Sequence, residues 1–359
     1  MKRKLSIVLL LLFCIFFNSV KSSFLASASE KLNINAKSAV VLEVMSGRII
    51  YEKNSNSKCF MASTTKILTA ITIIENCDIN SQVIVGQNTV GVEGSSIYLE
   101  VGEKLSVLDL LYGLMLRSGN DCAETLAVYC SGSISEFAKL MNNTAKKIGA
   151  FNSNFVNPHG LHDENHYTTA MDLALISRYA MQNETFRQIV GTKSIKIPFT
   201  TRDSARLLIN KNKLLSRLEG CTGIKTGFTK KAGRCLVSSV KKDNFEYICV
   251  VLDCPNMWEE SISAFKYAFN KFSNNIYIDK SNIVSFIPIK NCDKKCPVYI
   301  KNNIIIPVTD EEKNSYYSVI DVPKEIPLGT KKDTHIGDLK IYVKKSLLFS
   351  EKIYTIIDI

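Results

Sequence analysis

A serine and a lysine three residues apart stand near the start of a long apolar segment. The segment covers residues 61–74, and Ser63 and Lys66 lie close to its beginning. Its length and continuous apolar character predict a buried helix, on which side chains three residues apart share a face. Burial and the positive N-terminal end of a helix both lower the pKa of a lysine, and a neutral amine can accept a hydroxyl proton. The pair therefore predicts a serine nucleophile that needs no histidine.

The Ser-x-x-Lys spacing is a weak signal on its own, because it recurs elsewhere in the chain. The other occurrences are Ser55/Lys58, Ser238/Lys241 and Ser263/Lys266. None of these pairs opens a long apolar helix. The prediction for Ser63 and Lys66 therefore rests on their position at a helix start.

A second candidate is the tripeptide Ser118-Gly119-Asn120, which interrupts a helical pattern between two predicted helices. In such a break the serine hydroxyl can relay a proton, and the asparagine amide can hold a lysine or a substrate carbonyl. The alternative is an ordinary helix-ending turn, and Ser273-Asn274-Asn275 shows the same pattern.

A third candidate is Lys225-Thr226-Gly227, a tripeptide that occurs once, within a predicted strand over residues 222–229. A strand glycine has no side chain and allows another backbone to come close. A lysine and a threonine hydroxyl beside it can bind a carboxylate. The alternative is a strand with a solvated lysine.

Strand patterns on both sides of a helical middle predict a single sheet. The predicted strands cover residues 40–44, 49–51, 222–229, 234–241 and 245–252. Helices are predicted at 61–74, 106–116 with Ser106 and Asp109 as a capping box, 121–129, 133–147, 169–181 with Thr169 and Asp172 at its start, and 257–272. The economical assembly is an α/β (α+β) domain in which a five-stranded antiparallel sheet carries helices on its faces and a helical subdomain.

The remainder of the chain predicts a small all-β domain. Beyond about residue 280 short β-type runs alternate with turn residues, at 283–289, 298–300, 304–308, 318–322, 339–343 and 353–357. The last ten residues alternate like a strand and lack a basic amphipathic face. We therefore expect a catalytic domain over 29–277 and a C-terminal β-rich domain over 280–359.

The first 28 residues have the composition of an export signal. A basic start, Lys2-Arg3-Lys4, precedes a 13-residue apolar run, and Ala26-Ser27-Ala28 supplies the small residues of a cleavage site. The run is short for a membrane-spanning helix. We therefore expect a signal peptide over 1–28, with an uncleaved membrane anchor as the alternative, and a protein that works outside the cytoplasmic membrane, in the cell wall or secreted.

Charge and cysteine content narrow the class of protein further. The net charge of +11 is spread without a long basic block, which favours an anionic surface such as a membrane or a cell wall over nucleic acid. The 11 cysteines include no zinc-type spacing, so no metal site is predicted. Cys292 and Cys296 can close a small disulfide loop or remain free thiols.

The three candidate motifs gain force from their order and context. Ser-x-x-Lys at a helix start, Ser-x-Asn between helices and Lys-Thr-Gly in a strand form the trio of penicillin-binding proteins and class A β-lactamases. The chain resembles the low-molecular-weight penicillin-binding proteins, the serine D-alanyl-D-alanine carboxypeptidases of the β-lactamase/transpeptidase-like fold. The likeness includes residues 61–66 with 68–70, Gly94-Ser95-Ser96 with residues 110–120, residues 157–161, and residues 225–229 with 232–233. The β-rich end is similar to the small C-terminal domain of that family.

The resemblance implies a role for each motif residue. Ser63 would be the acylated nucleophile, Lys66 its general base, and Ser118 a proton relay. Substrate would be held by Asn120, Lys225, Thr226 and Gly227, with the backbone N–H groups of Ser63 and Phe228 as the oxyanion hole. The family needs no metal or other cofactor.

The resemblance also implies a substrate and inhibitors, and it leaves two alternative functions open. The substrate would be a peptidoglycan stem peptide ending in D-Ala-D-Ala, and β-lactams would be covalent inhibitors. A β-lactamase would add a carboxylate base, for which Asp163 and Glu164 are the nearest acids. A non-catalytic penicillin-binding or wall-binding protein would be expected to lose Ser63, Lys66 or Lys225. Membrane-surface association and the oligomeric state stay open.

Overall fold

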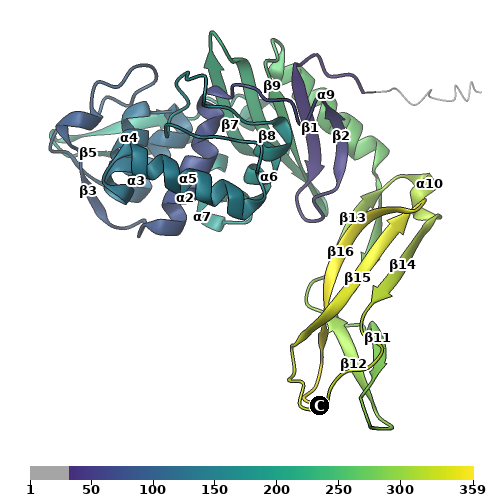
Figure 1. Ribbon diagram of the computed structural model, residues 1–359. Coiled ribbons are helices and arrows are strands. Elements are labelled where there is room, and N and C mark those ends of the chain that lie inside the picture. The colour runs from purple at the N-terminus through teal and green to yellow at the C-terminus, as the bar shows by residue number, and fades with distance from the viewer. Residues whose placement is uncertain (1–31) are drawn as a thin grey trace, which may run out of the picture. The chain divides into compact units, whose positions relative to one another are not determined.

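A five-stranded antiparallel sheet combines strands from before and after the helical region of the sequence. The computed structural model describes residues 32–359, so the predicted leader lies outside the described residues (Figure 1). The strand order is β2–β1–β9–β8–β7. The strands are β1 (Ser38–Glu43), β2 (Ile49–Lys53), β7 (Cys221–Thr229), β8 (Gly233–Lys242) and β9 (Phe245–Leu252). The predicted pairing of early strands with late strands is confirmed, since β1 pairs with β9.

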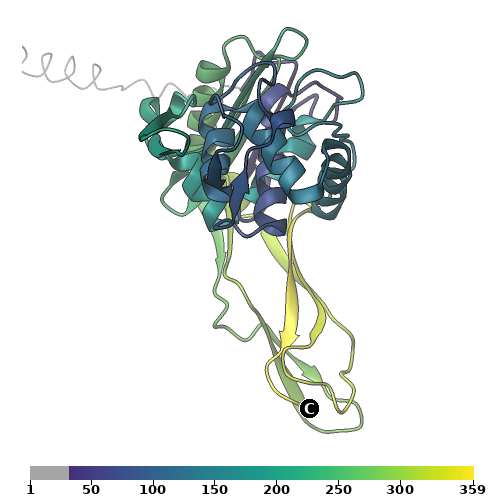
Figure 2. The same ribbon diagram turned by 90° about the vertical axis from the view of Figure 1, so that its left-hand side faces the viewer.

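Helices cover the sheet, and most of the predicted ones are present. They are α2 (Lys66–Asn76), α3 (Val107–Tyr112), α4 (Asn120–Ser131), α5 (Ile134–Ile148), α6 (Ala170–Ala180), α7 (Glu184–Gly191), α8 (Leu214–Arg217) and α9 (Met257–Lys271). Figure 2 looks at the sheet through the layer that contains α2 to α6. The predicted capping box of Ser106 and Asp109 starts α3, and Thr169 caps α6. Local capping chemistry therefore sets these helix starts.

Strand β9 shows why the sheet needs helices on both faces. All eight of its residues are buried. The side chains of Ile248, Val250 and Leu252 belong to the large core shared with the helical layer. The opposite face of the strand carries Cys249, whose sulfur lies 3.9 Å from the hydroxyl of Ser261 on α9. Because successive strand residues point to opposite faces, a continuous apolar run is buried between two layers.

The two helix segments nearest the candidate motifs are not regular α-helices. The predicted helix over 61–74 begins with a 3₁₀ turn, η1 (Ala62–Thr65), and continues as α2. Ala62 has a left-handed φ of 47°, which prevents an α-helix from starting earlier. Helix α3 continues through a π-helical turn, η3 (Gly113–Arg117), up to Ser118. Single π turns are frequent at functional sites.

Two hairpins escaped the sequence prediction. They are β3 (Gln82–Ile84) with β4 (Lys104–Ser106), and β5 (Ser194–Phe199) with β6 (Ser204–Ile209). Pro198 and several charged residues blur the strand pattern of the second hairpin. Both hairpins flank the segment between residues 85 and 103, which leads to the candidate site.

The C-terminal part is β-rich, as predicted. One sheet has the order β11–β12–β16–β15–β14, and a separate pair joins β10 to β13. The strands are β10 (Asn274–Ile278), β11 (Ser285–Pro288), β12 (Lys295–Ile300), β13 (Ile304–Val308), β14 (Tyr316–Asp321), β15 (His335–Val343) and β16 (Ser346–Thr355), with a short helix α10 (Asp310–Lys313). They enclose an apolar core of their own. Because β10 pairs with β13, the predicted boundary at 277–280 lies at the end of a strand that joins the C-terminal part.

The cysteines of the C-terminal part are free thiols in this structure. Cys292 is exposed in the turn between β11 and β12, whereas Cys296 is buried on β12 opposite Ile287. The small disulfide loop considered from the sequence is therefore not formed here.

Candidate active site

Ser63 and Lys66 lie side by side, as their spacing predicts. The Nζ atom of Lys66 lies 3.1 Å from the Oγ atom of Ser63. The same amine contacts two further oxygens, Oδ1 of Asn120 at 2.7 Å and the carbonyl oxygen of His159 at 2.7 Å. Lys66 is completely buried, while Ser63 is partly exposed. The hydroxyl is therefore accessible to a ligand and the amine is not.

The three contacts of the amine suit a neutral lysine as well as a charged one. A neutral amine has two N–H groups and one lone pair. If the N–H groups point at Asn120 and His159, which offer only acceptor oxygens, the lone pair faces the hydroxyl of Ser63. The pKa of Lys66 is lowered well below its usual value, first by burial and then by the positive charge of Lys225. The surroundings therefore favour a form of Lys66 that can accept a proton.

The loop that contains His159 and Gly160 packs against η1, and its His159 carbonyl contacts the amine of Lys66. A side chain on Gly160 would put its Cβ 2.0 Å from the carbonyl oxygen of Ala62, so only glycine allows this approach. The hydroxyl of Thr69 on α2 donates to the carbonyl of Pro158 at 2.7 Å. These contacts fix the loop against the helix that begins with Lys66.

Two buried histidines support the same loop in their neutral form. Burial lowers the pKa of His159 to about 3 and that of His166 to about 4, with the positive Lys66 contributing in both cases. The Nδ1 atom of His159 accepts a hydrogen bond from the Leu161 amide, so its Nε2–H can donate to Glu124, 3.3 Å away. The ring of His166 contacts the hydroxyl of Thr65 at 2.8 Å. The contact of the His159 carbonyl with Lys66 was not predicted from the sequence.

Ser118 is held in an unusual conformation with an unused hydroxyl. Its φ of 64° is left-handed, and its side chain is 4% exposed. The Oγ atom has no hydrogen-bond partner among residues 32–359. Strained backbone and an unsatisfied buried hydroxyl are both costly, and such features cluster at functional sites.

Asn120, the first residue of α4, is fixed by the loop that precedes β4. Its backbone amide donates to the carbonyl of Ser95 at 2.7 Å, and its Nδ2 donates to the carbonyl of Glu93 at 2.5 Å. The orientation of the side-chain amide is thereby set, with Oδ1 directed at Lys66. The loop also contacts Lys211, whose amine donates to the hydroxyl of Ser95 at 2.9 Å.

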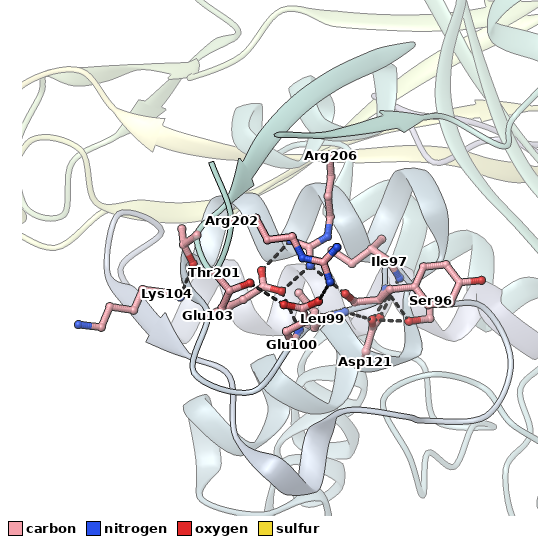
Figure 3. Close-up of polar contacts among 12 residues, drawn as sticks. Ser96, Ile97, Leu99, Glu100, Glu103, Lys104, Asp121, Thr201, Arg202 and Arg206 are labelled. Atoms are coloured by element: carbon pink, nitrogen blue, oxygen red, sulfur yellow. Dashed lines mark hydrogen bonds and ion pairs between the residues drawn. The ribbon is translucent and has the colours of Figure 1, made fainter. Parts of the chain in front are cut away.

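Asp121 holds this loop from the side of α4 (Figure 3). Its Oδ2 atom accepts hydrogen bonds from the hydroxyl of Ser96 at 2.5 Å and from the amides of Ile97 and Leu99, both at 3.1 Å. Asp121 is only 1% exposed. A carboxylate that receives several hydrogen bonds in a buried site is a strong anchor for a loop.

The β5–β6 hairpin holds the same loop from the other side (Figure 3). Arg206 makes a two-pronged ion pair with the fully buried Glu103, and donates to the carbonyl of Tyr98 at 2.8 Å. Arg202 pairs with Glu100 in the same region. A bidentate pair of arginine with carboxylate fixes geometry as well as charge. The segment next to Asn120 is therefore clamped between α4 and the hairpin.

The Lys-Thr-Gly strand passes directly beside η1. A Cβ on Gly227 would lie 2.9 Å from the carbonyl oxygen of Met61 and 3.1 Å from the amide nitrogen of Ser63. The close backbone approach that the sequence suggested is therefore present, and it requires glycine. It also brings the backbone leading to Phe228 next to residue 63. The assignment of these two N–H groups as an oxyanion hole stays a prediction.

Lys225 is buried in this strand with few partners. It is 1% exposed, and its amine contacts the carbonyl of the neighbouring Thr226 at 3.1 Å. Burial, and then the nearby charge of Lys211, lower its pKa to about 7. The structure thus joins Ser63, Lys66 and Asn120 by direct contacts, packs Gly227 against Ser63 and places Lys225 near enough to affect the pKa of Lys66. Ser118 and Thr226 are brought to the same region as chain neighbours of Asn120 and Gly227.

Sequence reasoning missed three contributors to this place. They are the backbone carbonyl of His159, the backbone carbonyls of the loop at Glu93 and Ser95, and the amine of Lys211. Backbone carbonyls carry no residue-type signal, so only the glycine in the Asn-Pro-His-Gly segment hinted at a close approach. Lys211 lies in a polar stretch that resembles any surface turn.

The acids considered for a β-lactamase are exposed residues with local contacts. Asp163 and Glu164 are exposed; Asp163 accepts from the Asn165 amide at 2.7 Å, and Glu164 contacts His162 at 3.2 Å. Within residues 32–359 no cluster of side chains could hold a metal ion. In that same part of the chain, no helix has the length and apolar character to span a membrane.

Comparisons with known proteins identify the family and the fold of this chain. The D-alanyl-D-alanine carboxypeptidase family matches residues 25–256. The D-alanyl-D-alanine carboxypeptidase DacF of Bacillus subtilis is 31% identical over 353 residues, covering 96% of this chain and 85% of that protein. The DacD carboxypeptidase structure from Francisella tularensis is 26% identical with a TM-score of 0.68, covering 95% and 97%. Penicillin binding protein 5 from Haemophilus influenzae has a TM-score of 0.77 at 24% identity, covering 91% and 98%, and shows the shared fold. The chain belongs to the D-alanyl-D-alanine carboxypeptidase family of serine peptidases, with the penicillin-binding-protein fold.

Proposed function

We propose that this protein is an exported serine-type D-Ala-D-Ala carboxypeptidase, which removes the terminal D-Ala from peptidoglycan stem peptides through an acyl-enzyme on Ser63. The observation that carries the proposal is the 3.1 Å contact of the Ser63 hydroxyl with a buried amine whose other contacts are oxygens of Asn120 and His159. β-Lactams, which resemble the D-Ala-D-Ala end, acylate the same hydroxyl.

Acylation begins with proton transfer from Ser63 to the neutral amine of Lys66. The freed oxygen attacks the carbonyl carbon between the two D-Ala residues. The developing oxyanion is stabilised by the backbone N–H groups of Ser63 and Phe228, and such donors each contribute about 3 kcal/mol to transition-state stabilisation. The terminal carboxylate of the peptide binds Lys225 and Thr226, which directs the chemistry to the last peptide bond.

Collapse of the tetrahedral intermediate requires a proton on the leaving amine. Ser118 relays it from Lys66, which is supported by its buried hydroxyl with no partner among residues 32–359. Asn120 keeps Lys66 in place during both transfers. After D-Ala departs, Lys66 deprotonates a water that hydrolyses the ester and restores Ser63.

A β-lactamase uses the same motifs and differs in the fate of the acyl-enzyme. Its rapid deacylation of β-lactams depends on an added carboxylate base. Asp163 and Glu164 are exposed and engaged in local contacts, which disfavours them as that base. The peptidase is therefore the better-supported function.

The test is release of free D-Ala from a peptide ending in D-Ala-D-Ala. Ser63→Ala should abolish release, whereas Ser216→Ala, at an exposed serine of α8, should leave it intact. Intact mass after incubation with a fluorescent penicillin should show a long-lived adduct on Ser63. Rapid turnover of the penicillin would favour the β-lactamase instead, and the absence of any adduct would contradict both enzymes.

Export and domain division are part of the same proposal. We place a signal peptide at 1–28, a catalytic domain at 29–277 and a C-terminal β-rich domain at 280–359. Mass spectrometry of the protein recovered outside the cytoplasm should give an N-terminus at residue 29. A full-length mass would instead indicate an uncleaved membrane anchor.

A further inference from the structure

Two half-buried cysteines meet at the far end of the helix pair that begins at the active site. Cys77 caps the C-terminus of α2, and Cys130 is the last residue but one of α4. The two thiols lie close enough together to change each other's pKa. Both side chains pack at the margin of the large core and remain partly exposed, so a small reagent can reach them.

The lengths of the two helices explain why these cysteines meet. At the near end, Lys66 at the start of α2 contacts Asn120 at the start of α4 over 2.7 Å. From there the chain advances 11 residues to Cys77 and 10 residues to Cys130. At a rise of about 1.5 Å per residue, both helices cover about 15–17 Å. Two packed helices that start together and advance equally end on the same side of the domain, which agrees with the mutual effect of Cys77 and Cys130 on their pKa values.

We propose that Cys77 and Cys130 are a redox modification site, at which a disulfide-class oxidant joins the two thiols into an intramolecular disulfide that ties the end of α2 to the end of α4. This site is separate from the proposed acylation of Ser63, because it lies at the opposite ends of the helices. It joins segments 53 residues apart in the chain.

The electron balance of the step is complete. The thiolate of Cys130 attacks one sulfur of the oxidant, the S–S bond of the oxidant breaks, and its first thiol leaves. Cys77 releases its proton to solvent, attacks the Cys130 sulfur of the mixed disulfide, and expels the second thiol. The protein loses two hydrogens and two electrons, and the oxidant is reduced to two thiols.

The surroundings of the pair favour the first attack by Cys130. The hydrogen bond from Cys77 lowers the pKa of Cys130 to about 6, and the same contact raises the pKa of Cys77. The hydroxyl of Ser131 also lowers the pKa of Cys130. The pair thus favours a thiolate on one sulfur and a proton on the other, which is the arrangement of a reactive pair.

Other cysteines of the catalytic region lack these properties. Burial raises the pKa of Cys122, Cys235, Cys249 and Cys254, so these thiols behave as packed apolar groups. Oxidation is therefore expected to be selective for the pair at the helix ends.

The test uses the full mature chain in a Cys292→Ser background, which removes the exposed thiol of the C-terminal part. The reduced protein is incubated with oxidised glutathione, alkylated, and digested without reductant. We expect an intact mass lower by two hydrogens and a linked peptide pair containing Cys77 and Cys130. The thermal midpoint, Tm, should rise by roughly 5 °C or more relative to the reduced form.

Matched variants decide the outcome. Cys77→Ser and Cys130→Ser should each abolish the linked peptide and the Tm difference, whereas Cys221→Ser, another half-buried cysteine, should leave both unchanged. Full alkylation of both thiols after oxidation, a stable glutathione adduct on one of them, or a link to another cysteine would overturn the proposal. Because the readouts are mass and Tm, a failure here is distinct from a failure of the peptidase assay.

Discussion

The two buried lysines of the site differ sharply in their surroundings. Lys66, at the start of α2, contacts three oxygens within 3.1 Å. Lys225, on β7, contacts only the carbonyl of the adjacent Thr226, at 3.1 Å, among the hydrogen bonds of residues 32–359. Both side chains are almost fully buried, and burial lowers the pKa of both. The two lysines are thus similarly buried but differ in the number of oxygen atoms that their amines contact.

The difference matches the two proposed roles, in which Lys66 is a preorganised base and Lys225 is an anion site that awaits its ligand. Lys66 has its contacts complete before substrate arrives, so little reorganisation is needed when it takes a proton. Lys225 has donors to spare, and a buried ammonium without a counterion is costly. A carboxylate would supply that counterion. The first two predictions below substitute these lysines one at a time.

The largest effect is expected from Lys66→Arg. Arginine keeps the charge but cannot lose its proton at neutral pH, so the base is removed. General base catalysis contributes about a hundredfold to ten-thousandfold, and we expect acylation of Ser63 by a fluorescent penicillin to slow by about a thousandfold. The measurement is the second-order rate constant of labelling, obtained by quenching the reaction at a series of times and quantifying the labelled protein by gel fluorescence.

The control for this change is Lys139→Arg, at an exposed lysine of α5 that pairs with Glu136. It should label at the wild-type rate. Lys66→Arg protein that still labels within tenfold of the wild type would show that another group takes the proton, and the contrast between the two lysines would lose its basis.

A smaller effect is expected from Lys225→Met. The change removes a charge-assisted hydrogen bond to the terminal carboxylate, which is worth about 1.5–3 kcal/mol, or about 10-fold to 100-fold in affinity. KM for a D-Ala-D-Ala peptide should therefore rise by that factor, with a smaller change in kcat. Steady-state release of D-Ala measures both constants.

A substrate variant provides the matched control. A peptide with its terminal carboxylate converted to an amide should be a poor substrate of the wild type. Lys225→Met should no longer distinguish the acid from the amide. Equal discrimination by both proteins would mean that Lys225 does not bind the carboxylate.

Asp121→Asn should affect the Lys66 side of the comparison alone. The substitution keeps the size of the side chain but replaces an acceptor oxygen that holds the loop at Ser96, Ile97 and Leu99 (Figure 3). A looser loop holds Asn120 less firmly, so we expect kcat for D-Ala release to fall by about tenfold with KM almost unchanged. A rise in KM without a fall in kcat would instead indicate a role in substrate binding.

Much of the fold was predictable from the sequence because its signals are local. Ser106 with Asp109, and Thr169, are capping residues next to apolar periodicity, and the structure begins helices at both. Strands β1 and β9 contain the continuous apolar runs at residues 39–42 and 247–252. The β5–β6 hairpin was missed, because Pro198 and its charged neighbours mask the alternation.

The site was predictable in its side chains and not in its supports. Ser63 and Lys66 are related by helical spacing, and the glycine at 227 predicts a close approach of another backbone segment. No local pattern pairs Glu103 with Arg206, which are 103 residues apart in the chain. Nor does any pattern reveal that the backbone carbonyl of His159 contacts the amine of Lys66. Such contacts depend on tertiary packing, which sequence spacing does not encode.

The smallest predicted effect concerns pH. As pH rises, more Lys66 becomes neutral and kcat/KM should increase. Lys225, whose pKa is about 7, loses its charge around neutral pH, and carboxylate binding should then weaken. The profile of kcat/KM, which reports the free enzyme, should therefore be bell-shaped. Its descending limb should give roughly a fivefold decrease between pH 7 and pH 8, calculated from that pKa.

Lys225→Arg separates the two limbs, because arginine remains charged throughout this range. The variant should have a lower maximum than the wild type, since a planar guanidinium fits a lysine site poorly, but its descending limb near pH 7 should disappear. The ascending limb, which belongs to Lys66, should remain. A descending limb that persists in Lys225→Arg would assign it to another group, and the distinction between a base and an anion site would then have to rest on KM alone.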